Sequence, residues 1–244
     1  MGWHRLVIGL TTLIASALAA ATTAPRGADE AGVRPFTAHY ELVLNGLTVG
    51  EAKARLQRKQ DHWVYHRESN LNGLAALLMD QKVVEEATFQ LDGARLKPLR
   101  FHYRHREGEE VKREQIRFDW GQGQARASYK DTTRTLTIPE GAVDRMTLEL
   151  VLMRAVGSDV DDKAYKVVNK AKLKTWVFER LGREVINTPA GRFEAVKVGR
   201  ARDADKPRKT IYWLVEELGY VPAKVEHHED GGPSVSLRLR ELAP

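Results

Sequence analysis

The stretch FTAHYELVL-NG-LTVGEAKARL, residues 36–56, sets the architecture of this chain of 244 residues. Apolar and polar side chains alternate in both halves, which is the period of a half-buried β-strand. Asn45 and Gly46 stand between the halves, and this dipeptide favours the two-residue turn in which both residues have positive φ. The segment therefore predicts a β-hairpin, and the same pattern continues along the chain.

Similar alternation with turn residues between the runs predicts a series of further strands. They are Trp63–Ser69, Lys82–Leu91, Leu99–Arg106, Val111–Trp120, Ala125–Tyr129, Thr132–Ile138, Ala164–Asn169, Lys172–Glu179, Arg183–Asn187, Ala195–Arg202, Thr210–Leu214, Ala223–Glu229 and Ser234–Leu239. Helical spacing interrupts the strands twice, briefly in Leu74–Met79 and clearly in Asp144–Val156. Asp144 stands at the N-cap position of the longer helix, and Gly157 stands where that helix is expected to stop.

This order of elements predicts a mainly β fold. We expect a curved antiparallel meander or a partly closed β-barrel with one main α-helix, and a two-sheet β-sandwich is the alternative. A membrane-spanning barrel is disfavoured because the face opposite the core carries charged residues such as Lys53, Arg55, Arg100 and Arg104.

The first 21 residues have the layout of a secretory signal peptide. A basic residue, Arg5, precedes the uncharged run Leu6–Leu18, and small side chains follow up to Ala21. We expect cleavage near Ala21, export to the periplasm and no transmembrane segment afterwards. Residues 22–34 are predicted to be a flexible lead-in, and residues 35–242 a single β-rich domain.

Composition excludes several classes of site. The chain has no cysteine, so it has no disulfide, no thiol nucleophile and no cysteine-containing zinc site. Its net charge is +6, but the two signs are interspersed, as in Arg104–Glu114, which we interpret as a solvated strand face and loop. A nucleic-acid-binding protein would need a stripe of one sign, so no nucleic acid partner is expected.

No motif predicts catalysis. His62 and His66 share one face of a predicted strand and are a conceivable metal pair, but scattered surface histidines are the favoured interpretation. The pairs Glu85-Glu86 and Glu109-Glu110 point to opposite faces of a strand and are interpreted as solvated. We therefore expect no metal, no cofactor, no catalytic residue and no enzymatic activity.

Aromatic residues in the strands have two interpretations: they fill the core, or some of them line an apolar cavity inside a curved sheet. The second interpretation makes six residues candidates for ligand binding, namely Trp63, Tyr65, Phe101, Tyr103, Trp176 and Trp213.

Several segments also resemble a known family. They are NTPAGRFEAVKV (187–198), IYWL (211–214), YVPAKV (220–225) and the early LNG (44–46) with Gly50. Together with the leader, they are similar to the DUF3108 family of exported bacterial proteins of unknown function. The resemblance implies a β-rich envelope protein shaped like the half-barrels of lipoprotein carriers such as LolA and LolB, and it supplies no catalytic residue. The residues themselves predict structural turns at Asn45, Gly46, Pro189, Gly191 and Pro222.

Three functions remain open at this level. The first is a non-enzymatic periplasmic binding or carrier protein with an apolar cleft for a lipid or acyl ligand. The second is a cell-envelope scaffold or assembly factor that binds a protein partner. The third, which the sequence favours least, is a hydrolase that acts on cell wall or polysaccharide.

Overall fold

A computed structural model describes residues 32–73, 76, 81–157, 163–200, 209–228 and 232–244. The predicted leader (1–21), most of the lead-in (22–34) and the leucines of the short helical segment Leu74–Met79 lie outside the described residues.

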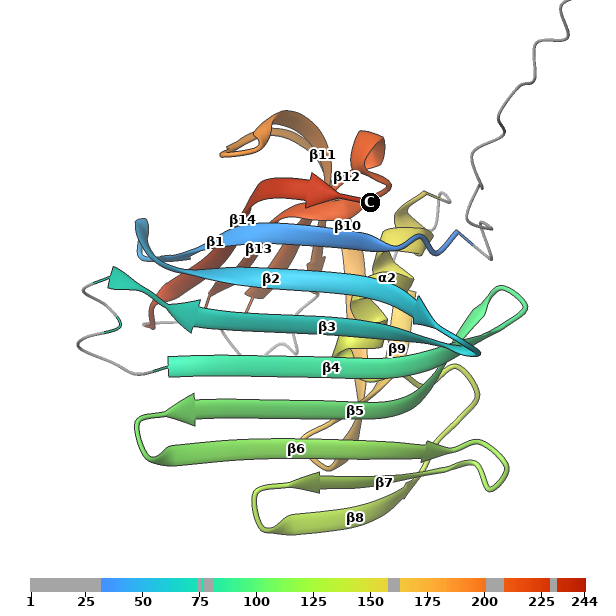
Figure 1. The fold of residues 1–244 in the computed structure, drawn as a ribbon. Helices are drawn as coiled ribbons and strands as arrows, with labels where there is room; N and C mark the ends of the chain where they lie inside the picture. Colours follow the sequence, from blue (N-terminus) through green and yellow to red (C-terminus); the bar gives the residue numbers. More distant parts are fainter. Residues whose placement is uncertain (1–31, 74–75, 77–80, 158–162, 201–208, 229–231) are drawn as a thin grey trace, which may run out of the picture.

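The strands form one antiparallel sheet of 14 strands in the order β8-β7-β6-β5-β4-β3-β2-β1-β14-β13-β12-β11-β10-β9 (Figure 1). Strands that are consecutive in the sequence pair with each other, except β8 and β9, which form the two edges of the sheet. The strand β1 also pairs with β14, which joins the two halves. The bounds are β1 Phe36–Leu44, β2 Leu47–Lys59, β3 His62–Leu71, β4 Gln81–Asp92, β5 Arg95–Glu107, β6 Glu110–Asp119, β7 Gln124–Tyr129, β8 Thr132–Thr137, β9 Lys163–Asn169, β10 Lys172–Thr188, β11 Gly191–Arg200, β12 Lys209–Val215, β13 Val221–His228 and β14 Ser234–Ala243. The predicted curved meander is confirmed, and it is a single open sheet instead of a two-sheet sandwich.

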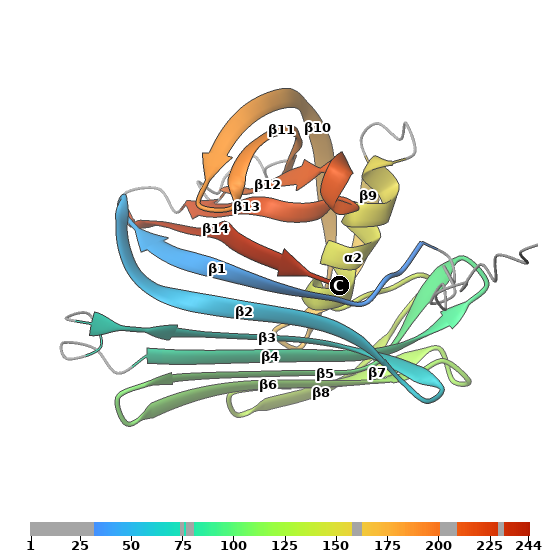
Figure 2. The same ribbon diagram turned by 45° about the horizontal axis from the view of Figure 1, so that its top comes forward.

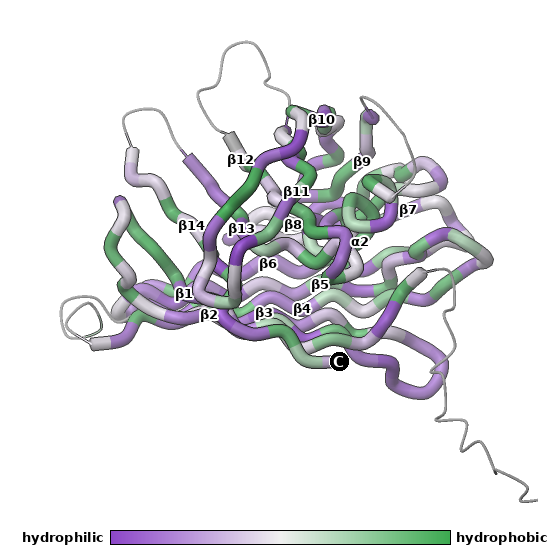
Figure 3. The backbone as a smooth tube through the Cα atoms, turned by 90° about the horizontal axis from the view of Figure 1, so that it is seen from above, coloured by the Kyte–Doolittle hydropathy of each residue, from purple (hydrophilic) through white to green (hydrophobic). Residues whose placement is uncertain are grey.

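The sheet bends so that its two halves face each other. We call β1–β8 the first limb and β9–β14 the second limb (Figure 2). The helix α2 (Arg145–Val156) lies between the limbs and packs against β4, β5 and β9. Seen from above, successive hydrophilic and hydrophobic segments alternate along the strands, as the period-two pattern requires (Figure 3). The core therefore lies on the inner face of both limbs and around α2.

The predicted hairpin turns are confirmed. Asn45 and Gly46 have φ values of 47° and 86°, so both central residues of the first turn are left-handed. Thr188 pairs with Gly191 across the turn that contains Pro189. Pro222 lies near the start of β13 beside a bulge, and its carbonyl accepts a hydrogen bond from the Tyr40 hydroxyl of β1 at 3.1 Å. This bond crosses β14 and so supports the bend between the limbs.

Two strands that the sequence predicts as separate are one continuous strand in the structure. Lys172–Glu179 and Arg183–Asn187 were expected to be separate strands, but β10 is one strand of 17 residues. A bulge between Arg180 and Gly182 shifts the register, and Gly182 has a φ of 107°. The bulge reverses which residues face inward, so the alternation breaks at this point although the strand continues.

The main helix begins and ends where the sequence predicts. The Asp144 carboxylate accepts hydrogen bonds from the backbone N–H groups of Met146 and Thr147, both at 2.9 Å, and from the Thr147 hydroxyl. Gly157 is the C-cap. The cap satisfies donors that would otherwise be buried without partners, because Asp144 is fully buried between the limbs.

Gly50 allows β2 and β3 to approach closely. It is buried, and a Cβ at this position would lie 2.2 Å from the Asn70 carbonyl oxygen and 2.9 Å from Leu71 Cα. Both contacts are to backbone, so a side chain at position 50 would force the strands to move. This gives a physical reason for a glycine four residues after the first turn.

We predict that Gly50→Ala lowers the free energy of unfolding by about 1–3 kcal/mol, as overpacking of a buried position does. Urea denaturation followed by circular dichroism measures this change. The matched control is Gly121→Ala, whose nearest contact is the flexible Asp119 carboxylate at 3.5 Å, and it should change stability by less than about 0.5 kcal/mol. Equal midpoints for the two variants would show that the close approach at Gly50 is not needed.

Candidate functional site

A cavity of about 590 Å³ lies between the two limbs. The first limb contributes Arg67, Val83, Glu85, Tyr103, Lys112 and Tyr129, the helix contributes Arg145, and the second limb contributes Asn169, Lys170, Trp176, Phe178, Arg200, Thr210, Tyr212 and His227. The lining therefore combines five aromatic rings with several basic side chains. It differs from the apolar cleft expected from the sequence, because charged groups share its wall with the aromatic ones.

Beside this cavity, α2 is tied to the sheet by buried ion pairs that we call the charged cluster. Its members are Arg67 of β3, Glu85 of β4, Glu114 of β6, and Arg145 and Glu149 of α2. Arg67 donates to Glu85 at 2.8 Å and to Glu149 at 3.0 Å. Arg145 donates to Glu85 at 2.7 Å and to Glu114 at 2.8 Å. Each guanidinium thus bridges two carboxylates.

The charged cluster also reaches the second limb. The backbone N–H of Lys170, in the β9–β10 turn, donates to Glu114, and Asn169 Oδ1 accepts a long bond of 3.5 Å from Arg145. The Arg145 guanidinium lies over the rings of Phe101 and Tyr103, 4.7 and 4.4 Å from their centroids. Three parts of the molecule, the first limb, α2 and the second limb, therefore meet in one polar network.

Burial and charge shift the pKa values of the groups in this region. Burial raises the pKa of Glu85, but the guanidiniums of Arg67 and Arg145 outweigh it and hold the pKa at about 2. Burial, followed by the negative charge of Glu149, raises the pKa of the Tyr65 hydroxyl, which donates a short hydrogen bond to that carboxylate. Glu85 is therefore ionised, and Tyr65 is neutral, at any physiological pH.

The interpretation of Glu85 and Glu114 as solvated residues is wrong. Their exposed fractions are 8% and 1%. A signal was present in the sequence: Glu85 is in phase with the buried Ala87 and Phe89, and Glu114 is in phase with the buried Ile116. A charged residue in phase with core residues points to a buried polar network. Arg67 has the same phase, because it lies two residues after the buried Tyr65 on β3.

Two of the six aromatic residues proposed as ligand-binding line the cavity, Tyr103 and Trp176. Trp63 stacks on Phe89 in the core with ring centroids 6.4 Å apart. Tyr65 and Phe101 are buried against the charged cluster, the first through Glu149 and the second under Arg145.

Trp213 is buried away from the cavity. It lies on the strand face opposite to Tyr212, where the ammonium groups of Lys197 and Lys224 are 5.1 and 4.2 Å from its ring centroid. Its indole N–H donates to Glu184 at 3.2 Å. The cavity residues that the aromatic prediction missed are Tyr129, Phe178 and Tyr212, together with the basic side chains.

The histidine pair does not approach the cavity. His62 contacts Asp61 at 3.1 Å, and His66 contacts Glu86 at 3.2 Å. Within the part of the chain that the structure describes, no three histidine, aspartate or glutamate side chains gather as metal ligands would.

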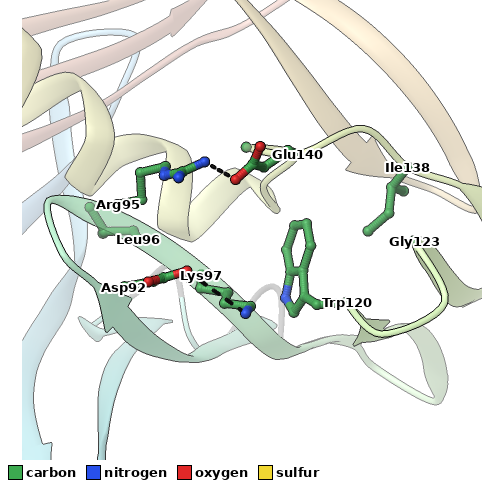
Figure 4. A pocket seen from close by; sticks show the side chains of 9 residues that line it. Asp92, Arg95, Leu96, Lys97, Trp120, Gly123, Ile138 and Glu140 are labelled. Carbon is green, nitrogen blue, oxygen red and sulfur yellow. Dashed lines mark hydrogen bonds and ion pairs between the residues drawn. The ribbon is translucent and has the colours of Figure 1, made fainter.

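A second cavity, of about 280 Å³, lies at the turns near Asp92 and Gly123 (Figure 4). Arg95 forms an ion pair with Glu140 at its edge, and Lys97 lies 3.9 Å from Asp92. The Trp120 indole N–H donates to the Pro98 carbonyl at 2.7 Å. The cations and the indole donor of this cavity thus have partners within the protein, and the cavity is half the size of the first.

Among the helices in the described ranges, none has the length and apolar character that a membrane span requires.

Comparison with known proteins gives a family and a fold. The model of the family DUF3108, described as a protein of unknown function, matches residues 36–240, and the chain belongs to this family. No curated protein matches the chain. A similar solved structure is a β-barrel-like protein of the domain of unknown function DUF1849 from Brucella abortus, with a TM-score of 0.55 and 8% sequence identity over 85% of this chain and 96% of that chain. This likeness shows the β-barrel-like fold alone.

We predict that the folded state loses stability as the pH falls from 4.5 to about 2, because Glu85 is ionised in this range when folded but takes up a proton when unfolded. Glu85→Gln should lower the free energy of unfolding by about 3–5 kcal/mol at neutral pH, since it leaves two buried guanidiniums short of a partner. The difference from the natural chain should shrink through that pH range. Urea denaturation at a series of pH values measures both effects.

Glu86→Gln is the control for this experiment. Glu86 is the next residue, faces outward and pairs with the half-exposed His66, so its loss should cost less than about 1 kcal/mol. A Glu85→Gln variant with the same pH profile as the natural chain would show that Glu85 does not anchor the charged cluster.

Proposed function

We propose that this DUF3108 protein is a non-enzymatic binding protein of the periplasm that holds an acyl or lipid-like ligand between the two limbs of its sheet. The observation that carries the proposal is the cavity of about 590 Å³, which aromatic side chains from both limbs line. Its volume falls within the range of about 300–1,000 Å³ that is usual for small-molecule sites.

The arrangement of the aromatic residues supports an elongated apolar ligand. Tyr103 and Tyr129 come from the first limb, and Trp176, Phe178 and Tyr212 come from the second. Phe178 and Tyr212 lie 6.2 Å apart, centroid to centroid, and form a continuous surface. A chain placed between these two groups of rings would be in contact with apolar atoms on both sides, which is how apolar surface leaves water.

The charged cluster favours binding over catalysis. A general acid or base works best with a pKa near the working pH, whereas two guanidiniums hold the pKa of Glu85 at about 2. Arg67 and Arg145 each donate to two carboxylates. Groups engaged in this way support the structure of the site, and the proposal gives none of them a role in a reaction.

The periplasmic location rests on the sequence. The basic start, the uncharged run Leu6–Leu18 and the small residues up to Ala21 have the layout of a cleaved leader. The absence of cysteine gives the chain no residue that an oxidising compartment would cross-link.

The two other functions have less support. A scaffold would be expected to show a contiguous apolar patch. The large hydrophobic residues that are exposed among those described are few: Val177, Leu181 and Val185 lie along β10, with Val177 and Val185 on opposite faces because of the bulge, and Leu47 lies in the first turn region. A hydrolase based on His62 and His66 gains no support from the two cavities described above, because neither residue lines them.

We predict that Val83→Phe weakens the binding of a dansyl-labelled undecanoic acid by about tenfold or more, because the larger ring would occupy space between the limbs. Val84→Phe is the matched control: the same substitution one residue further on β4 points to the opposite face. Fluorescence titration measures both affinities, and native mass spectrometry of protein from its own host tests for a co-purified lipid. Equal affinities for the two variants, with no lipid retained, would overturn the proposal.

A further inference from the structure

Strand pairing gathers five arginines on the outer face of the first limb, on the side of β5, β6 and β7 that faces away from the core (Figure 1). We call them the arginine patch. All five are exposed, and they are Arg100, Arg104, Arg113, Arg117 and Arg126. Their neighbours Phe101 and Ile116 are buried in the core, so the alternation along each strand directs the arginines outward.

The register of the sheet places these arginines side by side. Arg117 of β6 lies directly opposite Arg100 of β5 and directly opposite Arg126 of β7. In a second row, four residues away along β5 and β6, Arg104 lies directly opposite Arg113. Directly opposite residues have Cβ atoms about 5 Å apart, and four residues of a strand span about 14 Å. The five guanidinium groups therefore belong to one compact area of the sheet.

Carboxylates do not compensate the charge of the arginine patch. Within the part of the chain that the structure describes, none of the five arginines forms an ion pair or a cation–π contact. Among the described outward-facing residues of β5–β8 that follow Arg100, the one acidic side chain is Asp119, which accepts a hydrogen bond from the Gln122 backbone N–H at 3.0 Å. The patch is therefore a surface of one sign.

Strand alternation separates charges that are mixed in the sequence. The segment Arg104–Glu114 contains both signs, and Arg104 faces outward. Glu107 and Glu110 are instead in phase with inward-facing residues, and they lie 3.7 and 3.4 Å from the ammonium group of Lys112, which lines the cavity. The acidic residues of this segment are thus engaged away from the patch.

An arrangement of this kind costs stability. Like charges directly opposite each other destabilise a sheet, whereas opposite charges in the same position stabilise it. The favourable case occurs elsewhere in this sheet, where Glu41 of β1 lies opposite Arg238 of β14 and the two form an ion pair at 2.8 Å. Rows of arginines without carboxylates leave positive charge that an anionic partner would complement.

The chemistry of the arginine patch favours a phospholipid surface over a nucleic acid. A guanidinium binds phosphate oxygens through two parallel N–H donors, and both partners carry phosphates. Nucleic acid sites add aromatic rings that stack on bases, or an element that enters a groove. The described outward-facing residues of β5–β7 from Arg100 onward include no aromatic side chain, and the arginines project from the face of paired strands. A bilayer presents many phosphates at once to such a face.

We propose that the arginine patch docks this protein on a membrane surface that contains anionic phospholipid. The lipid phosphates accept hydrogen bonds from the guanidinium groups and offset the repulsion between them. Each arginine close to an anionic membrane contributes about fivefold to the affinity. The patch faces away from the cavity between the limbs, so this inference does not depend on the proposed acyl ligand.

Co-sedimentation of the predicted mature chain, from Thr22 onward, with lipid vesicles tests the inference. One set of vesicles contains phosphatidylcholine alone, and the other contains an equal mixture of phosphatidylcholine and phosphatidylglycerol. We expect binding to the mixed vesicles to be at least about tenfold stronger. This binding should weaken steeply with salt, because the reach of a charge falls from about 10 Å in 0.1 M salt to about 3 Å in 1 M salt.

The first variant removes the row of three arginines through Arg100→Gln, Arg117→Gln and Arg126→Gln. It should bind the mixed vesicles about 100-fold more weakly, as the loss of three arginines implies. Its midpoint in urea should equal that of the natural chain or exceed it, because like charges that lie opposite each other are removed. Its affinity for dansyl-labelled undecanoic acid should be unchanged, since the row lies on the face opposite to the cavity.

The matched control is a second triple variant, Arg55→Gln, Arg192→Gln and Arg240→Gln, which changes the net charge by the same amount. These arginines are exposed on β2, β11 and β14, outside the patch. The control should bind the mixed vesicles within about twofold of the natural chain, because screening limits the effect of distant charges. An equal loss of binding in the two triple variants, or a loss in neither, would overturn the arginine patch as the docking surface.

The remaining outcomes identify the partner and separate the two proposals. Equal binding of the natural chain to both kinds of vesicle, or binding to neither, would overturn the anionic membrane as the partner. Binding of a double-stranded DNA oligonucleotide that the first variant loses, without binding to the mixed vesicles, would also overturn it, in favour of a nucleic acid. Failure of the natural chain to bind dansyl-labelled undecanoic acid would overturn the acyl-binding function and leave the membrane inference in place.

Discussion

Two guanidiniums shared among three carboxylates hold α2 against the inner face of the sheet, and the shape of the molecule follows from this arrangement. Arg67, Glu85 and Glu114 come from the first limb, and Arg145 and Glu149 come from the helix. The β9–β10 turn joins the same network through the backbone of Lys170. Charged groups are buried at a cost that only their mutual contacts offset, so the network tolerates little change in the distances between its members. It thereby fixes the spacing between the two limbs, and the cavity is the space that this spacing leaves.

A polar network at this position also explains why the inner face does not close into a core packed with apolar side chains throughout. Apolar residues around α2 form a continuous core, but the surface beside the charged cluster must offer polar partners. The aromatic residues of the lining suit such a boundary, because a ring has an apolar body and can accept a cation on its face. Arg145 over Phe101 and Tyr103, and Arg200 over Trp176, show this use of aromatic residues. The result is a cavity with aromatic walls and a charged side.

The similarity to a DUF1849 protein from Brucella abortus concerns the path of the backbone. At 8% identity, a β-barrel-like fold is reached by sequences with few residues in common, because period-two burial and bulges specify the fold without specifying particular side chains. Function depends on the side chains at the site. The charged cluster and the Arg200–Trp176 pair are therefore described for this chain only. Membership in DUF3108, a family of unknown function, does not identify a ligand for either of them.

The sequence by itself determined the local structure: the first hairpin with its Asn45-Gly46 turn, the turn at Pro189, the Asp144 cap of α2 and the mainly β class. These features depend on interactions between residues close together in the chain, which short patterns record. The sequence predicted two strands where β10 is a single one, because a bulge breaks the alternation of buried and exposed residues without ending the strand. The phase of Glu85 and Glu114 with core residues was a local sign of their burial, but the tertiary structure decided which charges they meet and which aromatic residues line a cavity. Glu85 and Glu86 are adjacent and chemically similar, yet one is buried between two arginines and the other faces outward, since the direction of the inner face is set by the bending of the whole sheet. For the same reason Trp176 lines the cavity and Trp213 does not: the pairing of strands far apart in the sequence determines what each side chain faces.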